Sequence, residues 1–150
     1  MNQHLKSHDG KAAVAPTLGA WQRPQRILVV DDDPALCQFG TEVLIRHGYQ
    51  VDAVEDNTTG WKALQIHTYD LLITDLDMPG LSGLKLVRRV RAARMALPVI
   101  LASGVMTPEE LNRTPWLHLS GALLKPVSPA QLLQTVQAVL RPPEQKSREI

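Results

Sequence analysis

The chain has 150 residues, of which 44% are hydrophobic and 21% are charged. This composition supplies a core for one domain of ordinary size and excludes global disorder. The formal net charge of +1 provides no general field for attracting nucleic acid or a membrane surface. The single cysteine, Cys37, excludes an intrachain disulfide framework and is expected to be a small buried core residue.

Both ends of the chain differ in pattern from its middle. Residues 1–25 mix Gly, Pro and polar residues without sustained periodicity, which predicts a flexible extension in which Trp21 packs on the domain. Paired prolines at 142 and 143 predict a polar tail over residues 141–150. Because no apolar run approaches the roughly 20 residues of a membrane helix and no secretory h-region is present, we expect a soluble cytoplasmic protein.

Between the tails, over residues 26–140, strand and helix patterns alternate five times. ILVV at 27–30 is a continuous apolar run, as expected for a strand buried on both faces. Further strands are predicted at 51–54, 71–74, 98–102 and 122–124. Helices are predicted from Asp33-Pro34 to near Gly48, at 58–67, at 82–96, and from Ser128-Pro129 to Leu140. Five such units predict an α/β fold with a parallel sheet covered by helices on both faces.

The segment between the last two strands, VMTPEELNRTPWLHLSG, is compact. Thr107-Pro108-Glu109-Glu110 is typical of a helix start, and Pro115 is expected to cut that helix short.

Polar residues stand where the predicted strands end. Asp31-Asp32-Asp33 follows the first strand, Asp75 the third, Ser103 the fourth and Lys125-Pro126 the fifth. An Asp after a strand is often only a helix cap, which is the role we expect for Asp33. Since the carboxyl ends of parallel strands meet at one edge of a sheet, the other groups are expected to converge there.

Such a cluster requires a cation. Carboxylates packed together repel one another and raise their own pKa values. Mg²⁺ relieves this repulsion, because it accepts a few carboxylate ligands and keeps positions open for water and phosphate oxygens. One carboxylate is then available as a nucleophile toward a phosphoryl group, with Lys125 placed to offset charge on the phosphoryl oxygens.

The runs ILVVDDDPAL, LLITDLDMPGLSG, PVILASG and LLKPVS, in this order, resemble the four signature blocks of response-regulator receiver domains. The resemblance covers about residues 25–140. It implies a doubly wound, flavodoxin-like sheet of strand order 2-1-3-4-5. It further implies a Mg²⁺-dependent phosphoacceptor switch rather than an enzyme, with self-catalysed phosphorylation and dephosphorylation at most. The implied phosphoryl donor is a phosphohistidine on a histidine kinase or phosphotransfer protein.

The resemblance also implies a role for each residue of the cluster. Asp75 would be the phosphoacceptor and also a metal ligand. Asp32 would bind the metal directly, Asp31 mainly through metal-bound water, and the backbone carbonyl of Asp77 would be a further ligand. Ser103 would hydrogen-bond the phosphate and report its presence, and Lys125 would pair with it. The loop over the site would be shaped by Pro79, Gly80, Gly83 and Pro126, the last after a cis peptide bond.

One departure from the family pattern affects the expected output. Receivers often carry Phe or Tyr three residues before the lysine, where this chain has Ala122, so the usual aromatic rotamer switch is absent. After the last helix about ten residues remain, too few for a DNA-binding domain. The run Arg88, Arg89, Arg91 and Arg94 is interpreted as a solvated face. We therefore expect a single-domain regulator whose output is a protein partner or a phosphorelay, with no direct nucleic-acid or membrane contact.

Two alternatives remain. A degenerate pseudo-receiver would serve only as a binding module, although the acidic pair, Asp75, Ser103 and Lys125 are all present. A phosphatase of the haloacid-dehalogenase type would use Asp75-Leu76-Asp77 as its D-x-D motif, but Pro79 stands where that motif has Thr or Val, and no later acidic metal-binding motif follows.

Overall fold

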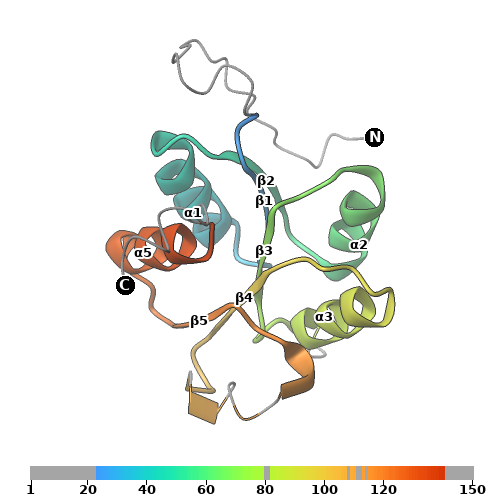
Figure 1. Ribbon diagram of the computed structural model, residues 1–150. Helices are drawn as coiled ribbons and strands as arrows, with labels where there is room; N and C mark the ends of the chain where they lie inside the picture. The colour runs from blue at the N-terminus through green and yellow to red at the C-terminus, as the bar shows by residue number, and fades with distance from the viewer. Residues whose placement is uncertain (1–22, 80–81, 108, 111–112, 114, 141–150) are drawn as a thin grey trace, which may run out of the picture.

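The computed structural model describes residues 23–79, 82–107, 109–110, 113 and 115–140. Within them, five strands form one parallel sheet of order β2-β1-β3-β4-β5, which confirms the expected fold (Figure 1). The strands are β1 (Arg26–Val30), β2 (Gln50–Val54), β3 (Leu71–Asp75), β4 (Val99–Ser103) and β5 (Gly121–Leu124). Asp75 and Ser103 are therefore the last residues of their strands, one position further inside the sheet than their predicted place after it.

Helices cover both faces of this sheet. They are α1 (Pro34–Arg46), α2 (Asn57–Ile66), α3 (Ser82–Ala92) and α5 (Pro129–Leu140), with a 3₁₀ turn, η3, at Pro115–Leu117. Helices α1 and α5 lie on one face and α2 and α3 on the other (Figure 1). None of the helices in the described ranges has the length and apolar character needed to span a membrane.

Short polar side chains start the helices, as the sequence predicted. The Asp33 carboxylate accepts a hydrogen bond from the Ala35 backbone N–H and caps α1, with Pro34 as its first residue. Ser128 and Gln131 form a reciprocal capping box at the start of α5. Asp33 is thus a cap, which separates it from the neighbouring aspartates of the site.

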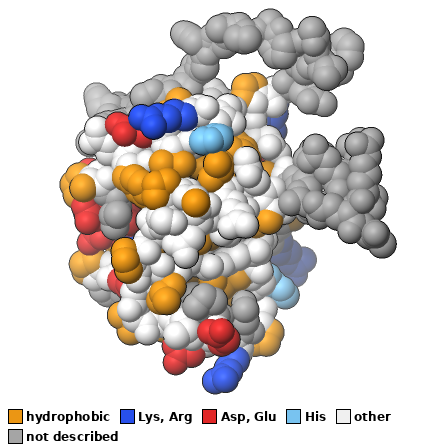
Figure 2. All heavy atoms as spheres, turned by 90° about the vertical axis from the view of Figure 1, so that its left-hand side faces the viewer, with side chains coloured by type: hydrophobic (Ala, Val, Ile, Leu, Met, Phe, Trp, Pro, Cys, Tyr) orange, Lys and Arg blue, Asp and Glu red, His pale blue; other side chains and the backbone are white. Residues whose placement is uncertain are grey.

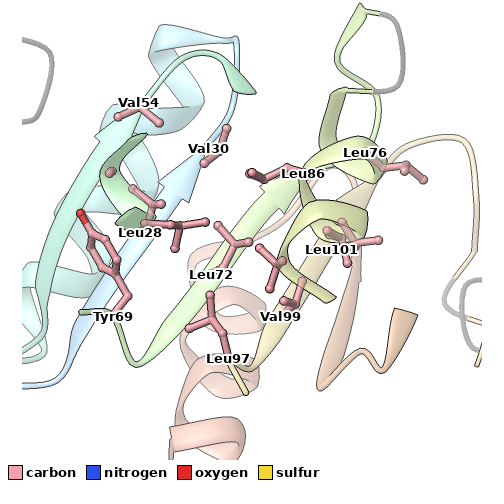
Figure 3. Close-up of a cluster of buried hydrophobic side chains, with 14 of the residues drawn as sticks. Leu28, Val30, Val54, Tyr69, Leu72, Leu76, Leu86, Leu97, Val99 and Leu101 are labelled. Carbon is pink, nitrogen blue, oxygen red and sulfur yellow. The ribbon is translucent and has the colours of Figure 1, made fainter. Parts of the chain in front are cut away.

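Two hydrophobic clusters fill the space between the sheet and its helices. On the α2–α3 side, Leu28, Leu72 and Leu101 of the central strands meet Leu86 of α3, and all four are fully buried (Figure 3). The alternate strand residues, among them Ile27, face α1 and α5. Because side chains on a strand alternate between faces, this double burial explains why the central strands β1, β3 and β4 are mostly apolar along their length.

The structure corrects the extent of α3 and the interpretation of its arginines. The helix ends at Ala92 rather than at 96, because Arg94 adopts a left-handed backbone conformation (φ 58°) that terminates it. Arg91 is partly buried and donates to four backbone carbonyls, those of Met95, Leu97, Leu117 and His118. Burial lowers the pKa of its guanidinium. The interpretation of the basic run as a solvated face is therefore wrong for Arg91.

Other predicted features fall at the edges of the described ranges. Thr107 and Glu110 exchange the hydrogen bonds of a capping box, as expected of a helix start, and the chain forms η3 from Pro115. The Gln25 carbonyl accepts from the Gln50 N–H, so contacts with the sheet begin before β1. Trp21, most of the N-terminal extension and the tail at 141–150 lie outside the described residues.

Candidate functional site

Three aspartates meet where strands β1 and β3 end. Asp31 and Asp32 follow β1, Asp75 ends β3, and one carboxylate oxygen from each lies within 4.8 Å of the other two. Asp31 and Asp75 are buried, whereas Asp32 is exposed. Chain connections from β1 and β3 run to opposite sides of the sheet, so this is the switch point in strand order where ligands bind in open α/β sheets.

Lys125, directly after β5, reaches across to this cluster. Its ammonium lies 2.9 Å from Asp75 Oδ1 and 3.7 Å from Asp31 Oδ2. Burial disfavours the charged ammonium, but the hydrogen bond to Asp75 and the charges of Asp31 and Asp77 outweigh burial and raise the pKa of Lys125. Lys125 therefore stays protonated and holds the Asp75 carboxylate, which also accepts from the Asp77 backbone N–H at 2.9 Å.

Asp31 lies where burial disfavours its charged form. Burial raises its pKa from 3.8 to about 6, and the nearby Asp75 charge adds to this, although the Asp33 N–H at 3.0 Å and Lys125 oppose the shift. Behind it, Cys37 Sγ donates to the Asp31 carbonyl at 3.1 Å, and burial raises the thiol pKa to about 12. Cys37 is thus the buried residue expected from the sequence.

The donor set fits a hard divalent cation. Three carboxylates face one ammonium, so the cluster carries excess negative charge in a partly desolvated place. Mg²⁺ prefers carboxylate oxygen ligands and needs only a few of them from the protein. The described residues therefore supply the oxygen ligands that such an ion requires, and one of them, Asp32, is exposed to solvent.

Ser103 and Asp77 form a second polar group beside the aspartates. The buried Ser103 hydroxyl donates to Asp77 Oδ1 at 2.9 Å and accepts from the backbone N–H groups of Val105 and Met106. The other Asp77 oxygen accepts from the Gly104 N–H at 2.7 Å. The sequence predicted a receiver role for Asp77 only through its backbone carbonyl, and this use of its carboxylate was not predicted. The available signal was that Asp77 and Ser103 stand near the ends of adjacent strands.

The residues expected to shape the site are placed as follows. A Cβ atom added at Gly83 would lie 2.1 Å from the Asp75 carbonyl oxygen, so only glycine fits where α3 passes under the site. The Lys125-Pro126 peptide bond is cis, as the resemblance implied. Pro79 lies exposed in the turn after β3, and Gly80 lies outside the described residues.

A cavity of about 380 Å³ lies between α1, α5 and the sheet. Its lining is apolar apart from Asp31 and Lys125, and includes Phe39, Gly40 and Leu132. Figure 2 faces this side of the molecule and shows hydrophobic side chains across its middle, with charged side chains mainly along its edges. The cavity adjoins the charged cluster through Asp31 and Lys125, and the rest of its lining is too apolar to bind a phosphate ion.

Residues 27–137 match the family model described as "Response regulator receiver domain". The match includes β2 to β5 and α1 to α3 in full, together with all of β1 except Arg26 and most of α5. The chain therefore belongs to the response-regulator receiver domain family.

Known proteins agree with this assignment. The chain is 32% identical to Protein RcaC of Microchaete diplosiphon and 29% identical to the transcriptional regulatory protein CusR of Escherichia coli (strain K12). Each match covers 77% of this chain, but 18% of RcaC and 51% of CusR, so the chain spans about half or less of the length of these relatives. The chemotaxis response regulator CheY4 of Vibrio cholerae is 28% identical, with a TM-score of 0.71 over 78% of this chain and 99% of that one.

Proposed function

We propose that this chain is a response regulator that accepts a phosphoryl group on Asp75 from a phosphohistidine donor. The observation that carries the proposal is the buried Asp75 carboxylate, held by Lys125 at 2.9 Å and placed within 4.8 Å of two further carboxylates. An Asp75 oxygen forms the new bond to phosphorus, the bond from phosphorus to the histidine nitrogen breaks, and an acyl phosphate results. Membership of the receiver family supports this phosphoacceptor role over the haloacid-dehalogenase alternative. The presence of Asp31, Asp32, Asp75 and Lys125 in one cluster favours it over the pseudo-receiver alternative.

The residues around Asp75 have different proposed roles in this transfer. Asp31 and Asp32, with the backbone carbonyl of Asp77, would hold Mg²⁺, which supplies positive charge to the phosphoryl oxygens when bound. Lys125 offsets negative charge on the transferred group because its ammonium already lies against Asp75. Ser103, the last residue of the adjacent strand β4, would donate a hydrogen bond to the phosphoryl group.

The proposed output is a phosphorylation-dependent protein contact or a phosphorelay in the cytoplasm. Receiver domains interact with histidine kinases, and the donor here is such a kinase or a phosphotransfer protein. CusR is named a transcriptional regulatory protein, and this chain matches about half of it. We assign no direct nucleic-acid contact to the domain: in its basic run, Arg91 is occupied by backbone carbonyls and Arg89 lies over the Trp61 ring.

Intact-mass analysis tests the proposal. Incubation with acetyl phosphate and Mg²⁺ is expected to add one phosphoryl group to the wild-type chain. The adduct should be absent from Asp75→Asn, which keeps the size of the side chain, and greatly reduced in EDTA. An adduct of equal yield in Asp75→Asn, or formed equally well without metal, would show that Asp75 is not the acceptor.

A further inference from the structure

The hydrogen-bonding capacity of the Ser103 hydroxyl is filled in this structure. A serine hydroxyl has one hydrogen to donate and two lone pairs to accept with. The hydrogen is given to Asp77 Oδ1 at 2.9 Å, and the lone pairs accept from the N–H groups of Val105 and Met106 at 3.0 and 2.9 Å. Ser103 can therefore donate to a new acceptor only if it gives up Asp77.

Asp77 connects this hydroxyl to the proposed phosphoacceptor. Its backbone N–H donates to Asp75 Oδ1 at 2.9 Å, while its carboxylate takes Ser103 with one oxygen and the Gly104 N–H with the other, at 2.7 Å. One residue thus ties the end of β3 to the loop after β4. Any rearrangement in which Ser103 donates to a group on Asp75 has to break the contact between Ser103 and the Asp77 carboxylate.

We propose that the Asp77 side chain is a positioning residue that holds Ser103 and the loop at 103–106 in the unphosphorylated arrangement. The inference rests on the proposed function, because the competing acceptor is the phosphoryl group on Asp75. Both acceptors are anionic, and both need the single Ser103 hydrogen, so each occupies it at the expense of the other. The Asp77 carboxylate therefore weakens the response of the loop to phosphorylation, and its removal favours the phosphorylated arrangement.

The test measures equilibrium binding of beryllofluoride, a phosphoryl mimic, at saturating Mg²⁺. Titration calorimetry would compare wild type, Asp77→Ala, Ser103→Ala and the double variant. Asp77→Ala is expected to bind about five- to tenfold more tightly than wild type, the effect of removing one competing hydrogen bond in a partly solvated position. In the Ser103→Ala background, the same change is expected to alter the affinity by less than about twofold.

These four proteins form a double-mutant cycle, which separates the proposed hydrogen-bond role of Asp77 from simple charge repulsion. If Asp77 acted only as a nearby negative charge, its removal would tighten binding equally with and without Ser103, and that result would overturn the proposal. Asp77→Asn gives a second check, since its amide oxygen still accepts from Ser103 without the charge. Its affinity should lie closer to wild type than to Asp77→Ala, and an affinity equal to that of Asp77→Ala contradicts the hydrogen-bond mechanism.

Amide NMR shifts provide a readout of the loop itself. In Asp77→Ala without ligand, the Gly104 and Val105 signals should move toward their positions in the wild-type beryllofluoride complex. Signals that remain at their wild-type free positions contradict the proposal. A wild-type chain that binds no beryllofluoride and takes no phosphoryl group would overturn the proposed function and this inference together, whereas equal tightening in both backgrounds overturns this inference alone.

Discussion

At the scale of single residues, Asp31 and Asp32 are chain neighbours with opposite environments. Asp31 is buried and its pKa is raised to about 6, chiefly by desolvation, whereas Asp32 is exposed. The pKa of Asp31 is therefore higher in the folded protein than its unfolded value of 3.8. Such a group contributes its full stabilisation of the fold at pH values below the unfolded pKa. The contribution is lost as the pH rises through the folded pKa. The metal-free protein therefore carries a cost at neutral pH that originates in its own site.

The upward shift of the Asp31 pKa predicts how the stability of the protein depends on pH. Between about pH 4 and pH 6, the metal-free wild type should lose on the order of 2–3 kcal/mol of unfolding free energy relative to Asp31→Asn. The variant keeps an oxygen for the Asp33 N–H but has no charge to desolvate. Urea unfolding of both proteins in EDTA at several pH values measures the difference. A difference independent of pH over this window would mean that Asp31 is ionised without penalty.

Replacement of Asp32 tests both the repulsion among the three carboxylates and their binding of Mg²⁺. We expect Asp32→Asn to weaken Mg²⁺ binding and, without metal, to melt at or above the wild-type temperature, because one of three mutually repelling carboxylates is neutralised. Thermal melts with and without Mg²⁺ measure both effects. A metal-free Asp32→Asn protein that melts lower than wild type would show that Asp32 stabilises the fold rather than straining it.

At the scale of elements, Arg91 joins α3 to the segment before β5. Its guanidinium donates to Leu117 and His118 in and after η3, and to Met95 and Leu97 after the helix. These carbonyls need a donor, and a planar guanidinium supplies several in a fixed fork. The side chain therefore holds the η3 turn against the end of α3.

We predict that Arg91→Met destabilises the protein by about 2–4 kcal/mol, since it leaves partly buried carbonyls without a donor. Arg91→Lys should lose most of the same stability, because an ammonium cannot span four carbonyls. The exposed Lys85 on the same helix provides the control, and Lys85→Met should lie within about 0.5 kcal/mol of wild type. Denaturant unfolding measures all three, and an Arg91→Met protein as stable as Lys85→Met would contradict this role.

Sequence patterns predicted these elements where local rules decide them. Apolar runs identified the strands, and caps such as Asp33 identified the helix starts, since both signals lie within a few residues. The partners of charged side chains were not predictable, because they depend on packing between distant segments. Asp52, in the strand predicted at 51–54, is fully buried and ion-paired with Arg26 at 2.7 Å, and it accepts from Tyr69. The Asp77 carboxylate was missed for the same reason.

At the scale of the whole molecule, the position of Ala122 determines how far a signal can travel. Ala122 is partly buried in β5, opposite Leu101 of β4, and packs against the hydrophobic cluster on the α2–α3 side. A methyl group has no rotamer to change, so movement of Ser103 creates no space into which this side chain could turn. The change after phosphorylation should then stay in the loops that the site itself contacts.

We therefore predict that beryllofluoride with Mg²⁺ shifts the amide signals of residues 77–79 and 103–107 strongly, and those of β5 and α5 weakly. Such a confined change still signals, provided that a partner binds the two loop arrangements with different affinity, and a coupling of about 1–3 kcal/mol gives a 5- to 150-fold preference. Chemical-shift mapping on the full chain measures the distribution, and Asp75→Asn provides the control for non-specific effects of the reagent. Shifts at residues 121–124 and along α5 as large as those at Ser103 would show that the signal crosses the sheet without an aromatic side chain. In that case the contact between β5 and Thr135 of α5, where Gly121 leaves little room, is the place to look for the route.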